Sequence, residues 1–208
     1  MSNMQQIKCE KPFSDKQIGE IGEHAVIQKL MENGWYAMNW NMGFNNMKSV
    51  DIVCFNPDER KTVNIQVKTA WITTDDADPN IITGLISDSD GNITPKLDEK
   101  IIGPWVFVTA TGEKGNMRFR YYILTKDEVK RLINDTNHWY VVETQRGEDG
   151  KGKLKGNVLI GLYLHWIKGD PNTKLDDTVN RKAFKHGPLK NPLHGIPDPE
   201  NKWDKIWK

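Results

Sequence analysis

The 208-residue sequence predicts an α/β protein, in which one mixed β-sheet carries helices packed against it. Two observations lead to this fold class. A capped amphipathic helix comes first, and β-branched apolar runs then alternate with turn-rich segments and a second capped helix. The composition is that of a globular protein, with 37% hydrophobic and 27% charged residues. The net charge of +1 indicates no class of partner.

The first helix is predicted over residues 15–33. Ser14 and Gln17 have the spacing of a capping box, and Gly34 is a typical C-terminal stop. At about 100° per residue, one half of the helical wheel collects the apolar face, which consists of Ile18, Ile21, Gly22, Ala25, Val26 and Leu30. Glu23 falls just beyond the edge of this face. We therefore expect its carboxylate at the border of the core.

The remaining apolar runs predict strands in a single sheet. The strands are expected from residue 35, and over 50–55, 63–69, 105–112, 117–124, 139–144 and 158–167. Residues 73–100, with seven carboxylates and two lysines, are interpreted as an acidic loop insertion with a turn at Asp90-Gly91. Thr125 is expected to cap a second helix.

Two parts of the chain are expected. One domain spans residues 14–165, and an irregular, basic extension containing prolines and tryptophans spans 166–208. Within the extension, Trp203 and Trp207 are four residues apart, which predicts a helical stripe docked on the core.

The hairpin formed by strands 50–55 and 63–69 places polar residues where they can meet. Directly opposed residues of an antiparallel pair point to the same face. A turn centred between Glu59 and Arg60 places Asp51 opposite Lys68, with Gln66 diagonally adjacent. A loop with an odd number of residues would instead send Asp51 to the other face, so the sequence permits this arrangement without forcing it.

Such a group suits metal-assisted phosphoryl chemistry, because Mg²⁺ prefers oxygen ligands in octahedral geometry. Lys68 is expected to orient or deprotonate the attacking water and to offset charge in the transition state. One carboxylate is little charge for a dication, so Glu23 is expected to hold a metal-bound water or a second ion, with Glu20 in reserve. The expected ligands are the Asp51 carboxylate, the Gln66 amide oxygen, the Val67 carbonyl and Glu23.

Three segments, GEIGEHAVIQKLMENGW, SVDIVCF and NIQVKTA, resemble the PD-(D/E)XK nuclease superfamily, which includes many restriction endonucleases and archaeal Holliday-junction resolvases. Glu23 matches the acid on the first helix of that family, Asp51 the strand aspartate and Lys68 the lysine. Gln66 stands where most members have a carboxylate, and a glutamine variant occurs in active branches. The resemblance covers about residues 16–133. It implies a restriction-endonuclease-like fold and Mg²⁺- or Mn²⁺-dependent cleavage of DNA in restriction, repair or recombination.

DNA is the partner that this resemblance implies, and an enzyme that cuts two strands is expected to dimerise. The candidate phosphate contacts are Arg118, Arg120, Lys126 and Lys130. A solvated charged face explains the same four residues equally well. Two alternatives stay open for the whole protein. One is a catalytically inactive DNA- or protein-binding module on the same fold, and the other is an unrelated α/β protein with a structural hairpin.

A cytoplasmic location is expected from the cysteines and from the hydropathy. Cys9 and Cys54 are far apart in the chain, and Cys54 lies in an apolar run, which predicts free, buried thiols. The first residues lack the apolar core of a signal peptide, and 18 apolar residues never run together, so no membrane span is predicted.

Overall fold

The computed structural model describes residues 11–40, 50–73, 80–86, 98–134, 159–163 and 200–208. In chain order its elements are α1 (Asp15–Glu32), β1 (Tyr36–Asn39), β2 (Ile52–Asn56), β3 (Lys61–Trp71), β4 (Asn80–Ile86), β5 (Trp105–Glu113), β6 (Asn116–Leu124), β7 (Leu159–Tyr163) and the 3₁₀ helix η3 (Trp203–Trp207). Residues 126–134 form a further helix. The predicted strand at 139–144, the Asp90-Gly91 turn and Cys9 lie outside the described residues.

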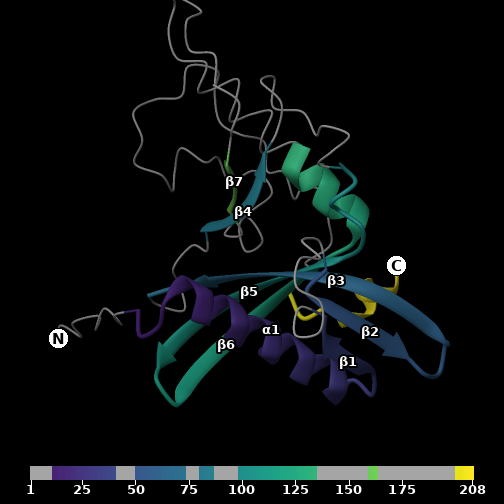
Figure 1. Cartoon of the computed structure of the whole chain (residues 1–208), viewed down its shortest axis with the longest axis horizontal. Helices are drawn as coiled ribbons and strands as arrows, with labels where there is room; N and C mark the ends of the chain where they lie inside the picture. Colours follow the sequence, from purple (N-terminus) through teal and green to yellow (C-terminus); the bar gives the residue numbers. More distant parts are fainter. Residues whose placement is uncertain (1–10, 41–49, 74–79, 87–97, 135–158, 164–199) are drawn as a thin grey trace, which may run out of the picture.

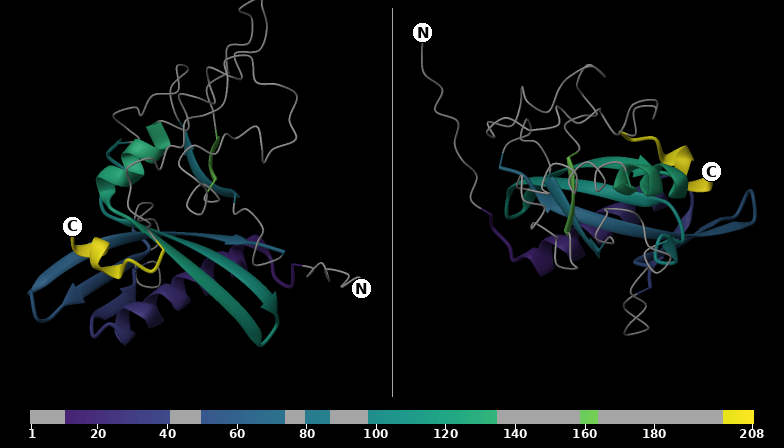
Figure 2. Two further views of the ribbon diagram at one scale, coloured as in Figure 1. Left: turned by 180° about the vertical axis from the view of Figure 1, so that it is seen from behind. Right: turned by 90° about the horizontal axis from the view of Figure 1, so that it is seen from above.

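The central element is a five-stranded mixed sheet in the order β1-β2-β3-β5-β6 (Figure 1). β3 pairs with β5 in parallel, and the other neighbours are antiparallel. Helix α1 runs along the sheet, and the helix at 126–134 stands beyond the end of β6 (Figures 1 and 2). The predicted α/β class with a mixed sheet and flanking helices is therefore confirmed.

The prediction of a single sheet is wrong for two segments. β4 lies inside the predicted acidic loop and pairs with β7 in a separate two-stranded antiparallel sheet. This pairing joins segments far apart in the chain, so local turn chemistry gives no signal for it. β7 therefore extends this second sheet and not the first.

Helix α1 begins with the predicted capping box. The Ser14 hydroxyl accepts from the Gln17 backbone N–H at 3.3 Å, and the Gln17 amide oxygen accepts from the Ser14 N–H at 3.0 Å. The predicted apolar face is buried except for Ile21, which is part-exposed. Gly34, with φ +83°, follows the helix end, as the sequence predicts.

Helix α1 lies close against β3 at Gly22. A Cβ atom at this position would lie 1.9 Å from Oγ1 of Thr69 and 2.8 Å from its Cβ. The second atom is tied to the backbone, so the clash is not relieved by rotating the threonine. Glycine is therefore required here by the packing of helix on strand.

The β2–β3 hairpin closes through a four-residue turn centred between Asp58 and Glu59. Oδ1 of Asn56 accepts from the backbone N–H of Asp58 at 3.0 Å and from that of Glu59 at 3.4 Å. Arg60 takes a left-handed conformation with φ 53°. The turn centre is thus one position earlier than the sequence predicts, because Asn56 caps the turn from the strand end.

This earlier turn shifts the strand register by two residues. Ile52 pairs with Ile65, so the next position places Asp51 opposite Gln66 and not opposite Lys68. The predicted facing of Asp51 and Lys68 is therefore wrong in register. Because the shift is even, the alternation of side chains is unchanged, and Asp51 still lies on the side that carries Gln66 and Lys68.

The last described residues dock on the sheet. Glu200 forms an isolated antiparallel β-bridge with Tyr122 of β6. Its carboxylate also forms a bidentate ion pair with Arg120, in which Nε and Nη2 donate at 3.0 and 2.9 Å. The rings of Trp203 and Tyr121 lie 5.3 Å apart. The predicted docking of the tryptophans is confirmed, but in a 3₁₀ helix instead of an α-helix.

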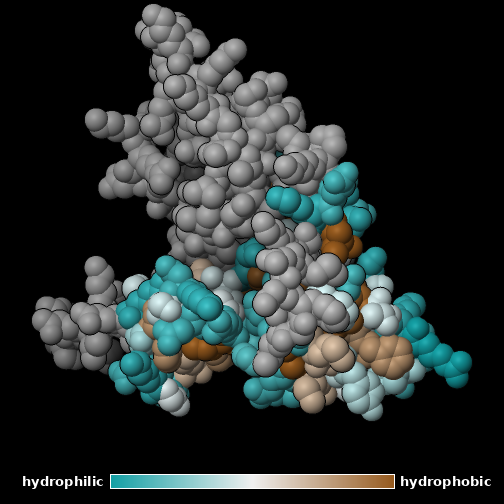
Figure 3. Space-filling view, viewed as in Figure 1, coloured by the Kyte–Doolittle hydropathy of each residue, from teal (hydrophilic) through white to brown (hydrophobic). Residues whose placement is uncertain are grey.

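An apolar cluster joins α1, the sheet and η3. Its buried members include Val26, Ile65, Val106 and Ile206. Cys54 also belongs to it as a free thiol, and burial raises its pKa to about 12. In the view of Figure 3 the described surface is mainly hydrophilic, with apolar side chains in small separate patches. Within the described ranges, no helix is long and apolar enough to cross a bilayer.

We predict that Gly22→Ala destabilises the fold by about 1–3 kcal/mol, because the added methyl overpacks the contact with Thr69. Gly19→Ala is the matched control, since a Cβ there meets nothing within 4 Å. It should stabilise the helix by up to about 1 kcal/mol. Urea unfolding measures both. Equal effects of the two substitutions would refute the close approach at Gly22.

Candidate active site

The site forms where β2 stops pairing with β3. The last paired residues are Ile52 and Ile65, so β3 continues beyond them with one edge unpaired by β2. Asp51 is 9% exposed and lies at this edge. Its Oδ2 accepts from the Val67 backbone N–H at 2.7 Å and from the Gln66 side-chain amide. The carboxylate thus takes the place of the missing strand partner.

The backbone of β3 also presents a carbonyl here. In an extended strand the N–H and C=O of one residue point to the same edge. The N–H of Gln66 bonds to the Pro104 carbonyl at 3.2 Å on the β5 side, so Val67 faces the opposite, open side. The carbonyl of Val67 is therefore directed to the edge where Asp51 lies, as the metal hypothesis requires.

Glu23 enters the site from α1. It is part-buried, and its Oε2 accepts from the side-chain amide of Asn39 at 2.6 Å. Asn39 is the last residue of β1 and pairs with Ile52, directly after Asp51. The helix and the end of β1 therefore fix the Glu23 carboxylate beside the Asp51 edge.

The electrostatics of the site are unfavourable to two carboxylates without a cation. Burial, followed by the negative charge of Asp51, raises the pKa of Glu23 from 4.5 to about 7. The bond from Asn39 and the charge of Lys68 lower the pKa by smaller amounts, and Glu20 raises it slightly. A nearby positive charge therefore favours the ionised form of Glu23.

Lys68 lies on the same stretch of β3, and its Nζ is 5.9 Å from the centre of the Trp105 ring. Trp105 is 1% exposed and pairs with Gln66 across the parallel strands. In the parts of the chain that the structure describes, Lys68 forms no ion pair. Its charge therefore remains available to an anion.

The donor set fits a hard divalent cation, although with few charges. Asp51 and Glu23 supply carboxylates and Val67 a carbonyl. The bond of the Gln66 amide N–H to Asp51 leaves its oxygen without a donor from the described chain. Such oxygen ligands, completed by water, are those of Mg²⁺. No described group of three or more His, Cys, Asp or Glu is placed to hold an ion, so any site here depends on Gln66 and the backbone.

The other candidate residues lie elsewhere. Glu20 is exposed, and its carboxylate is 3.8 Å from Lys16. Of the four proposed phosphate contacts, Arg120 is paired with Glu200, and Lys130 lies 2.5 Å from Asp98. The remaining two, Arg118 and Lys126, are exposed. Their role in binding nucleic acid stays a prediction.

Two residues of the site were not predicted from the sequence. Asn39 carries no motif, and only its position at the end of the first strand, next to Asp51 in the sheet, connects it with Glu23. Trp105 begins an apolar strand, and its sequence context predicts only a buried strand residue. Its pairing with Gln66 follows only from the register of the parallel strands β3 and β5, which the sequence does not indicate.

Comparison with known proteins gives similarity to solved structures only at low sequence identity. No family model matches the chain, and no curated protein matches it. Among solved structures, the chain is similar to the bacterial homing endonuclease I-Ssp6803I, with 18% identity and a TM-score of 0.39. The match covers 55% of this chain and 71% of that one.

We predict that Glu23→Gln stabilises the metal-free protein at neutral pH. The pKa of Glu23 is higher in the folded protein than in the unfolded chain, so the protonated carboxyl stabilises the fold relative to the ionised one. This stability is lost as the pH rises from about 4.5 to 7. The stability gained by Glu23→Gln should therefore be near zero at pH 4.5 and full above pH 7. Solvent screening of this part-exposed group limits the gain to about 1 kcal/mol.

Urea unfolding in EDTA, repeated across this pH range, measures the gain. Glu20→Gln, one turn earlier and exposed, is the control and should show no comparable trend. A gain that is independent of pH would contradict the burial and repulsion of Glu23.

Proposed function

We propose that this protein is a metal-dependent endonuclease that hydrolyses phosphodiester bonds in DNA. The observation that carries the proposal is the convergence of Asp51, Gln66 and Glu23, with Lys68 beside them, at the open edge of β3. Burying the carboxylates of Asp51 and Glu23 beside a lysine that forms no ion pair with the described residues is a costly arrangement for structure alone. They suit a reaction in which a cation and a phosphate enter together.

Asp51, Glu23, the Gln66 amide oxygen and the Val67 carbonyl would hold the ion, Mg²⁺ or Mn²⁺. When bound, such an ion polarises a phosphoryl oxygen and lowers the pKa of bound water. Asp51 has one oxygen committed to the Val67 N–H, so its orientation is set before any ligand arrives. Glu23, held by Asn39, orients a water on the side of α1.

Lys68 has two tasks in this proposal. Its ammonium donates to the attacking water or to a non-bridging phosphate oxygen, and its charge offsets the negative charge that builds up in the transition state. The ring of Trp105 limits where the ammonium can lie. A lysine held in this way contributes positive charge without binding the carboxylates permanently.

A catalytically inactive binding module is the second candidate, and Gln66 is the observation that favours it. The side-chain N–H of Gln66 donates a hydrogen bond to the Asp51 carboxylate, where an ion would otherwise bind. The carboxylate therefore has a partner without an ion. Such a protein would bind DNA or another protein and cut neither strand. The two candidates differ in divalent-metal dependence.

We predict that the wild-type protein nicks or linearises plasmid or branched DNA in Mg²⁺ or Mn²⁺ and is inactive in EDTA. Asp51→Asn should lower the cleavage rate at least about 100-fold, because it removes the charge that holds the ion but keeps an acceptor for Val67. Lys68→Gln should lower it about 100-fold or more, the usual size of acid–base and charge effects. Gel assays at single turnover measure these rates.

Lys16→Gln is the matched control, since it removes an exposed lysine of α1 outside the site and should leave the rate unchanged. Cleavage at equal rates by the wild type, Asp51→Asn and Lys68→Gln would exclude the mechanism. Metal-independent DNA binding without cleavage would favour the inactive module.

A further inference from the structure

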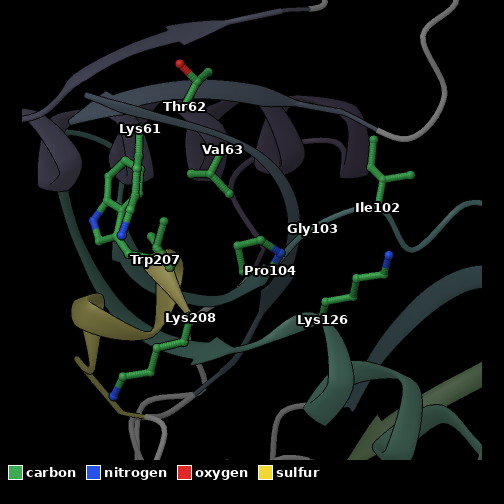
Figure 4. A pocket seen from close by; sticks show the side chains of 10 residues that line it. Lys61, Thr62, Val63, Ile102, Gly103, Pro104, Lys126, Trp207 and Lys208 are labelled. Atoms are coloured by element: carbon green, nitrogen blue, oxygen red, sulfur yellow. The ribbon is translucent and has the colours of Figure 1, made fainter. Parts of the chain in front are cut away.

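A pocket lies at the start of β3, and none of its lining residues belongs to the candidate active site. Its volume is about 320 Å³, which is in the range of pockets that accept small organic ligands. It is bordered by the start of β3, the loop at 102–104, the first residue of the helix at 126–134, and η3 (Figure 4).

One part of the pocket is apolar. The side chains concerned are Val63, Ile102, Pro104, Ile206 and Trp207. Ile102 is 42% exposed, which places a large apolar side chain in water at the pocket border. Trp207 is held edge-on by Trp35, with ring centres 5.1 Å apart. The pocket therefore offers a fixed aromatic ring and an uncovered aliphatic side chain to a ligand.

The other part is cationic. Lys61 and Lys126 line the pocket from different elements, and Figure 4 shows Lys61 beside Trp207 and Lys126 on the side of Ile102. Lys61 is 2.6 Å from Glu59, but both side chains are about half-exposed, and such surface pairs contribute little and exchange readily.

Lys126 has no ion pair within the described ranges. The nearby acid Glu128 does not neutralise it. Glu128 caps the helix by accepting from the Thr125 N–H at 2.9 Å, and it pairs with Lys205 at 2.7 and 2.9 Å.

Lys208 also lines the pocket, but its ammonium is 2.6 Å from Asp204. The charges left for a ligand are therefore those of Lys61 and Lys126.

We propose that this pocket binds a nucleoside phosphate, with the base against Trp207 on one side and the phosphate at Lys126 on the opposite side (Figure 4). Lysine ammonium groups bind phosphate oxygens as point charges, and a planar base stacks on indole whatever its identity. The ligand is either a free nucleotide or one nucleotide of a nucleic-acid strand, because both present the same chemistry.

Isothermal titration calorimetry in EDTA tests the proposal with 5′-AMP, adenosine, inorganic phosphate and a short single-stranded DNA. We expect 5′-AMP to bind with one site per chain, and adenosine and phosphate to bind at least about tenfold more weakly. Lys126→Gln should weaken binding of 5′-AMP about tenfold, through the loss of one charged contact. Lys16→Gln should bind like the wild type. Trp207→Phe, which keeps a ring, should bind more tightly than Trp207→Leu.

The oligonucleotide distinguishes the two sources of the ligand. Binding of 5′-AMP indicates a free nucleotide, whereas binding of the oligonucleotide alone, weakened by Lys126→Gln, indicates a nucleic-acid strand. The proposal is overturned if neither binds, if adenosine or phosphate binds as tightly as 5′-AMP, or if Lys126→Gln and Lys16→Gln behave alike. Asp51→Asn should bind like the wild type, so this result is independent of the proposed nuclease activity.

Discussion

The site depends on one hydrogen bond, from the Val67 backbone N–H to the Asp51 carboxylate. β2 leaves β3 at Ile52, and the next N–H along the edge of β3 would otherwise be buried without an acceptor. Leaving a buried donor unsatisfied costs about 1–3 kcal/mol. Asp51 removes this cost, and in doing so it is fixed at the one place where β3 also directs the Val67 carbonyl outward. Structure and proposed chemistry thus use the same carboxylate.

The second constraint is the close approach of α1. Only glycine at position 22 lets the helix lie against Thr69, and the next residue is Glu23. The packing therefore brings a second carboxylate to Asp51, although burial and then the charge of Asp51 raise the pKa of Glu23. The cost of this burial and repulsion is offset by the apolar contacts of Val26 and Leu30 on the same helix, both of which are fully buried. A helix that is held so firmly keeps the two acids together in the absence of an ion.

The sequence predicted those features that local chemistry determines. The capping box of α1 and its buried face follow from spacing and alternation. The even-numbered turn that keeps Asp51, Gln66 and Lys68 on one side is permitted by the sequence but not forced by it. Register did not follow, because the Asn56 side chain selects the turn centre and the sequence permits several.

Pairings between distant segments could not be predicted from the sequence. β4 and β7 form their own sheet, and Arg120 pairs with Glu200, eighty residues further along. Composition and periodicity carry no information on which of many acids a given arginine meets. For the same reason Asn39 was missed, since only the β1–β2 pairing places it beside Glu23.

A crystal soaked in Mn²⁺ tests most directly whether the open edge of β3 is a metal site. We expect an anomalous peak within about 2.5 Å of a carboxylate oxygen of Asp51, with Gln66 turned to present its amide oxygen and Glu23 bound directly or through water. An Asp51 carboxylate still bonded to the Gln66 amide, with no anomalous peak beside it at saturating Mn²⁺, would exclude a metal site at this edge.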